Sequence, residues 1–279
     1  MKRFLLGIGI WSFGALSAFA ADLPTKAPPP VAPVSNWTGV YIGGDVGGEW
    51  TNSSWTTTCL QNPLAIGTVV CPNNFPNRLI QNNPAGFNNS GFRAGVFAGA
   101  NWQVSSWVVG IEGDVHWADI KKTRAGIPGA EDFTVAGAPG LDSSSIDANA
   151  DGSLRLRGGF LVIPTVLLYG TGGIAVAHVE ATAHCGTAFT VGWCAPNVGV
   201  TQSSSENRVG WTVGAGVEAM IVSNWLLRGE YRYADYGSFS STVLNNGQVD
   251  AVTFNTKFRT NTAMIGVAYK FGGPILAKY

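Results

Sequence analysis

The sequence predicts an all-β fold, an eight-stranded antiparallel transmembrane up-and-down β-barrel with long extracellular loops. Apolar residues alternate with polar or small residues along short segments, and the connections between these segments alternate in length. The chain of 279 residues is 46% hydrophobic and 12% charged, with 37 Gly. After residue 20 no apolar run approaches the length of a membrane-spanning helix, which needs about 20 apolar residues. A chain of this size can fold as one barrel.

The alternation is clearest between residues 208 and 236. Every odd position from Val209 to Ala219 is apolar, whereas the even positions hold Gly, Thr and Glu218. A period of two indicates a strand with one apolar face. After a break at residues 222–224, three charges in a row occupy one face. They would not fit the buried face of a soluble sheet, but they fit a strand with lipid outside and a polar lumen inside. The faces of residues 225–236 carry Leu227, Tyr231 and Tyr233 against Arg228, Glu230 and Arg232.

Six further segments show the same alternation and complete a set of eight strands. They are residues 39–50, 91–102, 107–117, 153–160, 165–180 and 262–271. Long and short connections alternate between the strands, which is the arrangement of outer-membrane barrels, with short turns in the periplasm and long loops outside. The expected long loops are residues 51–90, 118–152, 181–207 and 237–259, and the short turns are 103–106, a turn near Pro164, and 222–224.

Two local features refine this arrangement. Asn246-Gly247 is a strong type I′ turn signal between two segments rich in β-branched residues, so the last two strands are expected to continue above the membrane as a hairpin. Trp and Tyr fall near the expected strand ends, as in the aromatic girdles of membrane barrels. The expected girdles are Trp37, Trp102, Trp107 and Trp225 at the periplasmic rim, and Trp50, Trp117, Tyr233 and Tyr236 at the outer rim.

The N-terminal residues 1–20 have the features of a signal peptide. Lys2 and Arg3 precede an apolar stretch that ends in the A-x-A pattern of residues 18–20, so cleavage is expected before Ala21; an uncleaved membrane anchor is the alternative. Residues 21–36 are rich in Pro and are expected to form an extended periplasmic leader. The remaining chain divides into a predicted outer-membrane barrel at residues 37–271 and a short C-terminal extension at residues 272–279.

Charge argues against a nucleic-acid partner. The chain has 17 Lys and Arg, two of them in the signal segment, against 17 Asp and Glu. No basic stripe is present.

Three stretches give the chain a family resemblance. They are the start of the mature chain, ADLPTKAPPPVAPVSNWTGVYIGGDVGGEW, the hairpin WTVGAGVEAMIVSNWLLRGEYRYADYG and the ending VAYKFGGP. The chain resembles the small outer-membrane immunogenic proteins of rhizobia and related alphaproteobacteria, within the porin-family group of OmpA-type eight-stranded barrels. This resemblance implies the Gram-negative outer membrane. The chain departs from the common pattern because residues 272–279 follow Phe271, so either Tyr279 or the pair Tyr269 and Phe271 would serve as the C-terminal aromatic signal for assembly.

All four cysteines fall in expected outer loops. Cys59 and Cys71 share the first long loop, and Cys185 and Cys194 share the third. In an exported chain, two local disulfides between these neighbours are the expected pairing. A zinc site near His184 is the alternative, but the paired C-x-x-C spacing is missing.

The inward face of the predicted barrel is rich in charge. An eight-stranded barrel has an interior just wide enough for its own side chains, so these charges should form Arg–carboxylate networks. Such a network would plug the lumen, whereas an ion-conducting path is the alternative; the inward Gly could make room for long side chains or leave a water-filled track. The predicted network contains Asp45, Glu49, Arg93, Glu112, Asp114, Arg155, Arg157, Glu218, Arg228, Glu230 and Arg232.

Other motifs lack the required context. Residues 214–219 fit G-x-G-x-x-A, but no helix is expected after them, as a dinucleotide site would require. His116 lies beside Asp114 on the inner face, and no nucleophile elbow accompanies it, so a polar partner in the lumen is the expected role. We therefore predict no catalytic residue, no metal and no cofactor.

Three functions follow from the sequence. The first is a structural barrel that supports envelope integrity and displays surface loops. The second is a narrow porin for ions or small solutes. The third is an adhesin or a haem-binding protein that uses the first and third long loops, with His178 and His184 as the candidates near the third. The expected partners are outer-membrane lipid and lipopolysaccharide, with a possible extracellular ligand at residues 51–90, and the expected state is a monomer.

Overall fold

The computed structural model describes residues 36–60, 85–128, 142–186, 199–222, 224–243 and 251–272. Eight long strands make up most of this part, and the two-residue β2 (Ala85–Gly86) precedes β3 and pairs with β1. Among the described residues, no helix is long and apolar enough to cross a membrane. The eight long strands are β1 (Gly39–Leu60), β3 (Asn89–Val104), β4 (Trp107–Ala125), β5 (Ser143–Ile163), β6 (Val166–His184), β7 (Thr201–Val222), β8 (Trp225–Val243) and β9 (Ala251–Phe271).

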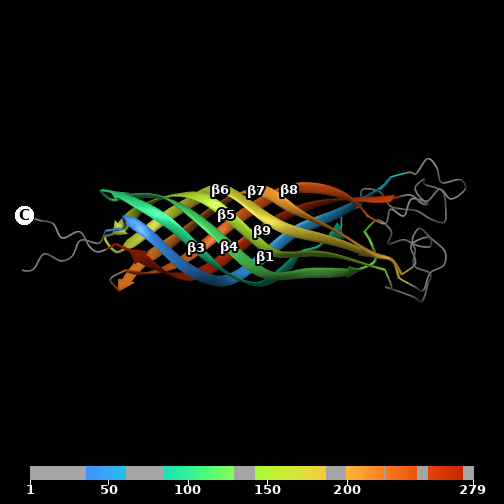
Figure 1. Ribbon diagram of the computed structural model, residues 1–279, viewed down its shortest axis with the longest axis horizontal. Coiled ribbons are helices and arrows are strands. Elements are labelled where there is room, and N and C mark those ends of the chain that lie inside the picture. Colours follow the sequence, from blue (N-terminus) through green and yellow to red (C-terminus); the bar gives the residue numbers. More distant parts are fainter. Residues whose placement is uncertain are drawn as a thin grey trace, which may run out of the picture. The chain divides into compact units, whose positions relative to one another are not determined.

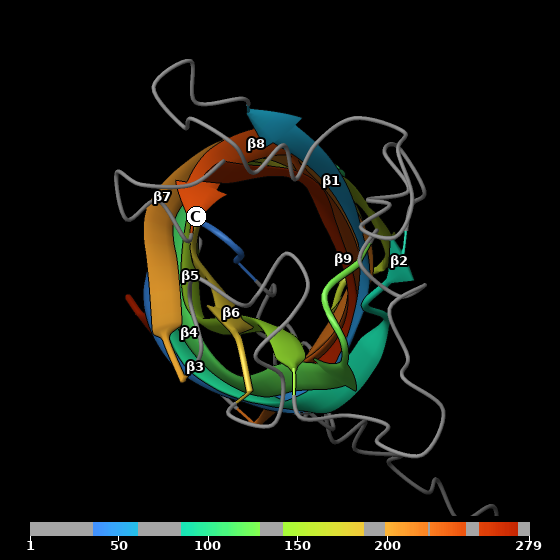
Figure 2. The same ribbon diagram turned by 90° about the vertical axis from the view of Figure 1, so that its right-hand side faces the viewer.

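The long strands close into a ring, as predicted. Each pairs antiparallel with its neighbours in chain order, and the β1–β9 pairing closes the sheet from Val40 opposite Phe271 to Leu60 opposite Ala251. The view along the strands in Figure 2 shows the closed ring, and Figure 1 shows the strands side by side along their length. In the part of the described barrel near the short turns, each long strand is paired on both sides, which suits a wall that faces lipid.

The connections alternate as predicted. At one end β3 and β4 are joined by residues 105–106, β5 and β6 by residues 164–165, and β7 and β8 by residues 223–224. Ser105 has a φ of 55°, the left-handed conformation that this tight turn requires. The ends of the strands on the other side are separated by longer segments.

The predicted loop boundaries were wrong on the side of the long connections. β1 continues to Leu60 and β4 to Ala125, while β5 begins at Ser143 and β7 at Thr201. The predicted loop at residues 51–90 is therefore interrupted by strand at both of its ends. The prediction counted outward apolar residues, but the outward residues of these extensions are polar, and their buried inward residues include Trp55, Ile120 and Ile146. The expected β8–β9 hairpin extension is confirmed as far as Val243 opposite Val252, and Asn246-Gly247 lies outside the described residues.

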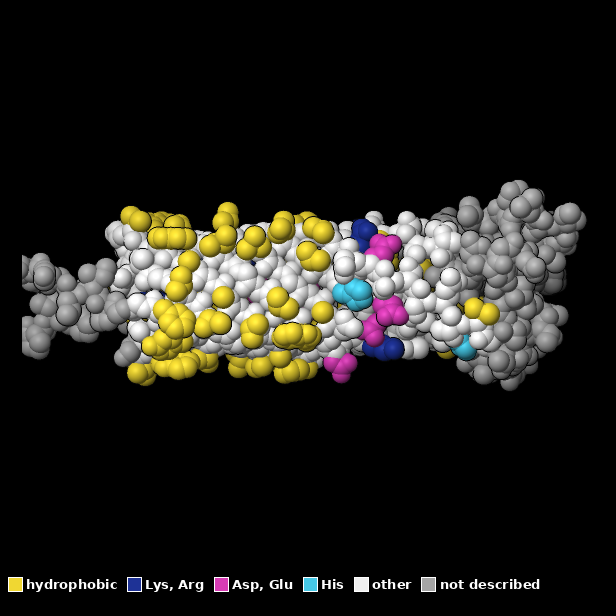
Figure 3. All heavy atoms as spheres, viewed as in Figure 1, with side chains coloured by type: hydrophobic (Ala, Val, Ile, Leu, Met, Phe, Trp, Pro, Cys, Tyr) yellow, Lys and Arg dark blue, Asp and Glu magenta, His cyan; other side chains and the backbone are white. Residues whose placement is uncertain are grey.

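The outward faces agree with the sequence pattern. The odd-numbered residues of β7, for example Val209 and Trp211, are exposed, whereas Glu218 on the other face is fully buried. Figure 3 shows hydrophobic side chains over the part of the wall near the short turns, with charged side chains beginning beyond them. This apolar band is the part of the wall that fits the hydrocarbon region of a membrane.

The predicted aromatic girdles are confirmed in part. At the short-turn end, Trp107 packs edge-on against Phe160, with ring centroids 5.4 Å apart. At the other border of the apolar band, the ring centroids of Trp211 and Tyr233 are also 5.4 Å apart. The assignments of Trp37 and Tyr236 to the girdles were wrong, because both are buried inside the barrel.

Both corrections have a local cause. Trp37 precedes β1 and turns into the barrel, where its indole Nε1 donates to the Pro164 carbonyl at 3.1 Å. Tyr236 falls on the inward face of β8, where its ring lies 5.6 Å from that of Phe258.

Candidate functional site in the barrel lumen

The inward side chains form three successive layers along the barrel. The layer next to the short turns, here called the lower layer, is mainly apolar and aromatic, with Lys270 and Asn101 also buried at this level. The middle layer is charged. The third, here called the upper layer, is again apolar and lies toward the long connections. The lower layer contains Trp37, Tyr41, Phe97, Val108, Leu167, Tyr169, Leu226 and Ala268, and the upper layer includes Trp55, Phe87, Ile127, Ile146, Val179, Tyr236, Phe239, Phe254 and Phe258.

Arg155 from β5 lies at the centre of the charged layer. Its Nη1 is 2.5 Å from Glu230 Oε1, and its Nη2 is 2.6 Å from Glu112 Oε1 and 2.9 Å from Asp114 Oδ2. One guanidinium thus joins carboxylates from β4 and β8 across the interior. Because side chains of this layer are nearly all buried, these bonds are made away from water.

Arg228 and Arg157 lie below Arg155, toward the lower layer. Arg228 Nη1 is 2.7 Å from Glu112 Oε2, and its guanidinium carbon lies 3.5 Å from the centre of the Phe97 ring. Arg157 pairs with Glu218 through Nη2, and its guanidinium carbon lies 4.2 Å from the centre of the Tyr169 ring. Both cations therefore combine a carboxylate with an aromatic face, a combination that stabilises a desolvated guanidinium.

Two tyrosines join the lower layer to the charged layer. Tyr41 donates its hydroxyl to Glu112 Oε2 at 2.8 Å and accepts from Arg157 Nη1 at 2.8 Å. Tyr169 donates to Glu230 Oε2 at 2.8 Å. These residues escaped the sequence prediction, which included only charged side chains in the lumen network. The signal was present in the alternation, because each is at an inward position of its strand.

On the upper side of the charged layer, Arg93 binds two carboxylates. Its Nη1 is 2.5 Å from Glu49 Oε2, and it holds Asp151 through both terminal nitrogens at 2.5 and 2.7 Å. Asp151 was also missed, since the predicted strand began at residue 153. Asp151 lies on the same strand face as Ser153 and Arg155, because side chains two residues apart point to the same side, so extending the alternation toward the N-terminus would have found it.

His116 has polar partners in the lumen, as the sequence indicated. Its Nε2 lies 2.8 Å from Asp45 Oδ1 and its Nδ1 lies 3.1 Å from Asp114 Oδ1. The ring packs over Gly95, where a Cβ atom would lie 2.2 Å from the imidazole Cδ2. Only glycine therefore fits beside His116 on β3.

The same neighbourhood contains a group with metal-ligand spacing. Ligand atoms of Asp114, His116 and Asp151 lie within 4.8 Å of one another. Arg232 Nη1 is 3.0 Å from Asp114 Oδ2, and Arg93 occupies both oxygens of Asp151. Since guanidinium groups already neutralise these carboxylates, ion pairing accounts for the arrangement.

All predicted members of the network lie in the charged layer, and they are brought together from different strands. The remaining candidates lie elsewhere. The glycine-rich residues 214–219 belong to β7 and are followed by strand. His178 Nδ1 bonds to Asn207 and His184 Nδ1 bonds to Thr201 on the outer wall. The two histidines are six residues apart on the same face of β6, so they lie about 20 Å from each other along the strand. This distance is too long for both to bind one haem iron.

The predicted disulfides fall largely outside the described residues. Cys185 is buried and disulfide-bonded. The side chain of Cys59, and Cys71 and Cys194 altogether, lie outside the described part, so the pairings remain predictions.

Comparisons with known proteins agree with the geometry. Residues 12–271 match the family model described as outer membrane protein beta-barrel domain. The chain is 31% identical to the 25 kDa outer-membrane immunogenic protein of Brucella abortus, over 91% of either chain. It is also 31% identical to the 31 kDa outer-membrane immunogenic protein of Brucella melitensis, over 97% of this chain and 100% of the relative.

A relative outside that genus and a solved structure complete the comparison. The 22 kDa outer membrane protein of Rhizobium leguminosarum is 29% identical over 65% of this chain and 67% of the relative. The outer membrane protein OprG from Pseudomonas aeruginosa is 12% identical, with a TM-score of 0.47, over 87% of this chain and 100% of that one. From the family match and the Brucella relatives, the chain belongs to the outer membrane beta-barrel family and is a protein of the Gram-negative outer membrane.

Proposed function

We propose that the chain is a structural barrel that supports the integrity of the outer membrane and displays surface loops, with a lumen closed to ions and solutes. The observation that carries the proposal is the layered interior, in which a charged layer lies between two apolar layers. The proposal assigns no catalytic step to the chain. The immunogenic relatives support the display of loops at the cell surface.

The charged layer opposes ion passage because its charges are already paired. Each of its five guanidinium groups lies within 3.0 Å of at least one carboxylate oxygen. An entering ion would have to displace such a bond inside a narrow barrel, where a freed partner is left desolvated.

The lower layer adds a second barrier, since an ion loses its hydration among apolar side chains. Trp37 fixes the mouth of the barrel at the short-turn end. Its indole reaches the turn between β5 and β6, and its backbone N–H donates to Gln103 Oε1 at 2.8 Å near the turn between β3 and β4. The start of the barrel domain thus ties two turns together across the opening.

The upper layer is the third barrier. Trp55 lies with its ring centroid 4.4 Å from that of Phe254 and 5.7 Å from that of Phe87. Across the interior, β6 presents small residues, Ala175, Ala177, Ala181 and Ala183, all buried. Large rings opposite small side chains fill the bore, as is common in small barrels.

The test is the conductance of the refolded mature protein in a planar bilayer. We expect the wild type to be silent. Arg155→Ala is expected to remain silent or nearly so, because the two apolar layers are intact. The triple variant Trp37→Ala, Arg155→Ala and Trp55→Ala removes a large side chain from each of the three layers and should open small channels. Arg259→Ala, on the outer wall, is the matched control and should stay silent. Gel mobility before and after boiling reports that each variant has folded.

A steady wild-type conductance whose ion selectivity changes in Arg155→Ala would replace the proposal with a narrow porin. If the wild type is silent and deletion of part of residues 61–84 abolishes binding to host surfaces or haem, the loops have the ligand-binding role.

A further inference from the structure

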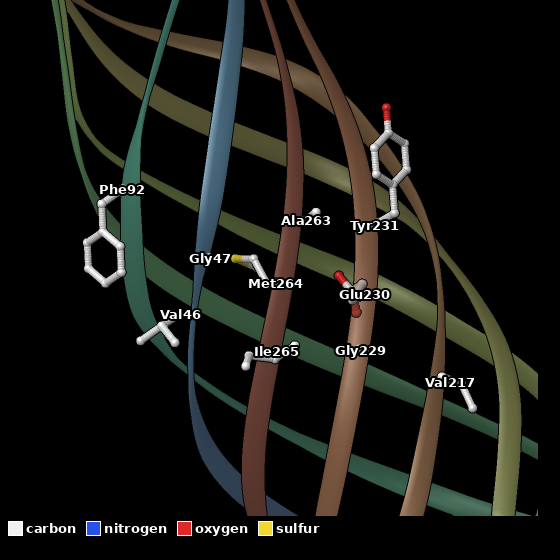
Figure 4. A pocket seen from close by; sticks show the side chains of 10 residues that line it. All are labelled: Val46, Gly47, Phe92, Val217, Gly229, Glu230, Tyr231, Ala263, Met264 and Ile265. Carbon is white, nitrogen blue, oxygen red and sulfur yellow. The ribbon is translucent and has the colours of Figure 1, made fainter.

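One side of the outer wall combines an apolar groove with basic residues directly above it. The groove runs over β3, β1, β9, β8 and β7 within the apolar band, and Figure 4 shows its side chains. It is hollow where side chains are small. At Gly229, a Cβ atom would meet no other atom within 4 Å. The outward residues that line the groove are Val46, Phe92, Val217, Tyr231, Ala263 and Ile265.

The groove continues toward the short turns. A second hollow on the same wall shares Val46 and Ile265 with the first and extends to Leu227 and Val267. An elongated apolar groove of this kind, open to the hydrocarbon region, fits an acyl chain in shape and polarity.

The outward positions of β9 lead from the groove to two cations. Asn261, the first outward position above Ala263, pairs in register with Trp50 of β1 and Tyr233 of β8, which mark the aromatic border of the band. The next outward positions are Arg259 and Lys257. They lie about 13 and 20 Å along the strand from Ala263, at the depth where lipid headgroups begin.

Both cations are available to a phosphate group. Lys257 is exposed, and its neighbours in register are Ser54 and Ser238. Arg259 uses its Nε to bind Asp235 Oδ2 at 2.8 Å, and its side chain is 38% exposed. A guanidinium has two further nitrogens that can donate hydrogen bonds, which suit phosphate oxygens.

The opposite side of the wall has the reverse charge at the same depth. Lys121 Nζ lies 3.9 Å from Asp147 Oδ2, with Glu180 and Asp119 nearby. Burial, together with Glu180 and Asp119, raises the pKa of Asp147, although Lys121 and His178 oppose that rise. An anionic headgroup would therefore be repelled there, so the sign of the charge selects the β9 side.

We propose that this surface binds a phosphorylated glycolipid of the outer leaflet, of the lipid A class, with an acyl chain in the groove and a phosphate at Lys257 and Arg259. The proposal rests on location in the outer membrane and does not depend on whether the lumen is closed.

The experiment is a titration of the refolded mature protein with purified diphosphorylated lipid A, followed by native mass spectrometry of the lipid adducts. We expect Lys257→Gln to weaken binding about fivefold, and Lys257→Gln with Arg259→Gln about twentyfold, since each surface cation contributes a similar amount. The matched control is Lys121→Gln on the acidic side, which should bind as the wild type does. Dephosphorylated lipid A should bind the wild type and the double variant equally.

The groove is tested separately by Gly229→Leu, which fills it without altering charge, with Ala263→Leu as a second filling variant. Both should weaken binding of lipid A, with or without its phosphates. Equal loss in Lys121→Gln and Lys257→Gln, or unchanged binding in the charge variants, would overturn the headgroup site. Unchanged binding in both filling variants would overturn the acyl-chain site.

Discussion

The part of the barrel inside the apolar band and the part beyond it are built from the same strands with opposite polarity. In the band, β9 directs Ile265 outward and Thr262 inward. Farther along the same strand, Asn255 and Lys257 point outward while Phe254 and Phe258 are buried in the lumen. The register with β1 continues without a shift from one part to the other.

The pleat therefore stays constant and only the medium outside changes. Where lipid surrounds the wall, apolar side chains face out and charges are confined to the interior. Where water surrounds it, the strands have the polarity of an ordinary soluble barrel with an apolar core. One strand thus has an outer face suited to lipid along part of its length and an outer face suited to water along the rest. The upper apolar layer is the core of the part in water.

The prediction with the largest expected effect removes one cation from the lumen at the level of the apolar band. Arg155→Ala leaves Glu112, Asp114 and Glu230 without their shared guanidinium, so we expect a loss of about 3–5 kcal/mol in the free energy of unfolding. The measurement is urea unfolding of the protein refolded into lipid vesicles. Arg259→Ala removes an exposed cation beyond the band and should cost at most about 1 kcal/mol. Similar losses in the two variants would contradict the distinction between the two parts.

The second test places the same charge on the outer face of each part. Ile265→Lys puts an ammonium into the hydrocarbon region and should cost about 2–4 kcal/mol. Asn255→Lys puts it at an exposed position beyond the band, where surface substitutions usually change the free energy of unfolding by less than about 0.5 kcal/mol. Unfolding in vesicles compares both with the wild type. If Asn255→Lys proved as costly as Ile265→Lys, position 255 would also face lipid.

The sequence was sufficient for the part in lipid, because apolar-outward alternation is rare in soluble sheets. It predicted the number of long strands, their faces and eleven charged residues of the network, although Asp151, which Arg93 binds, was missed. It failed beyond the band, where Ser and Thr alternate with scattered aromatic residues over segments such as 51–60. That pattern resembles a polar loop unless the inward residues are known to meet, and Trp55 and Phe254 meet only once the barrel has closed.

The direction of side chains near the strand ends could also not be predicted from the sequence. Trp37 lies two residues before β1 begins at Gly39, so its burial depends on contacts such as the hydrogen bond to the Pro164 carbonyl across the barrel mouth. Which carboxylate each arginine binds was likewise unpredictable, since it depends on the stagger of all eight strands.

The smallest expected effect compares two carboxylates beyond the band. Burial alone would raise the pKa of Asp235, but hydrogen bonds from the Gly237 amide and Arg259, with the charge of Arg259, outweigh it and lower that pKa. A lowered pKa means that Asp235 contributes stability above its unfolded pKa of about 3.9, and that this contribution is lost as the pH falls through the lower folded value. For Asp147, whose pKa is raised, the sign is reversed, and stability is gained as the pH falls through its folded value.

Acidification from pH 7 to pH 3 should therefore separate the two residues. Asp235→Asn should lose less stability than the wild type over this range, and Asp147→Asn should lose more. Each difference should be below about 1 kcal/mol because both side chains are near the surface. Urea unfolding at both pH values measures them. If both variants shifted in the same direction, the acidic side of the wall would lack the repulsion that distinguishes it from the side at Arg259, and the charge contrast around the barrel would be wrong.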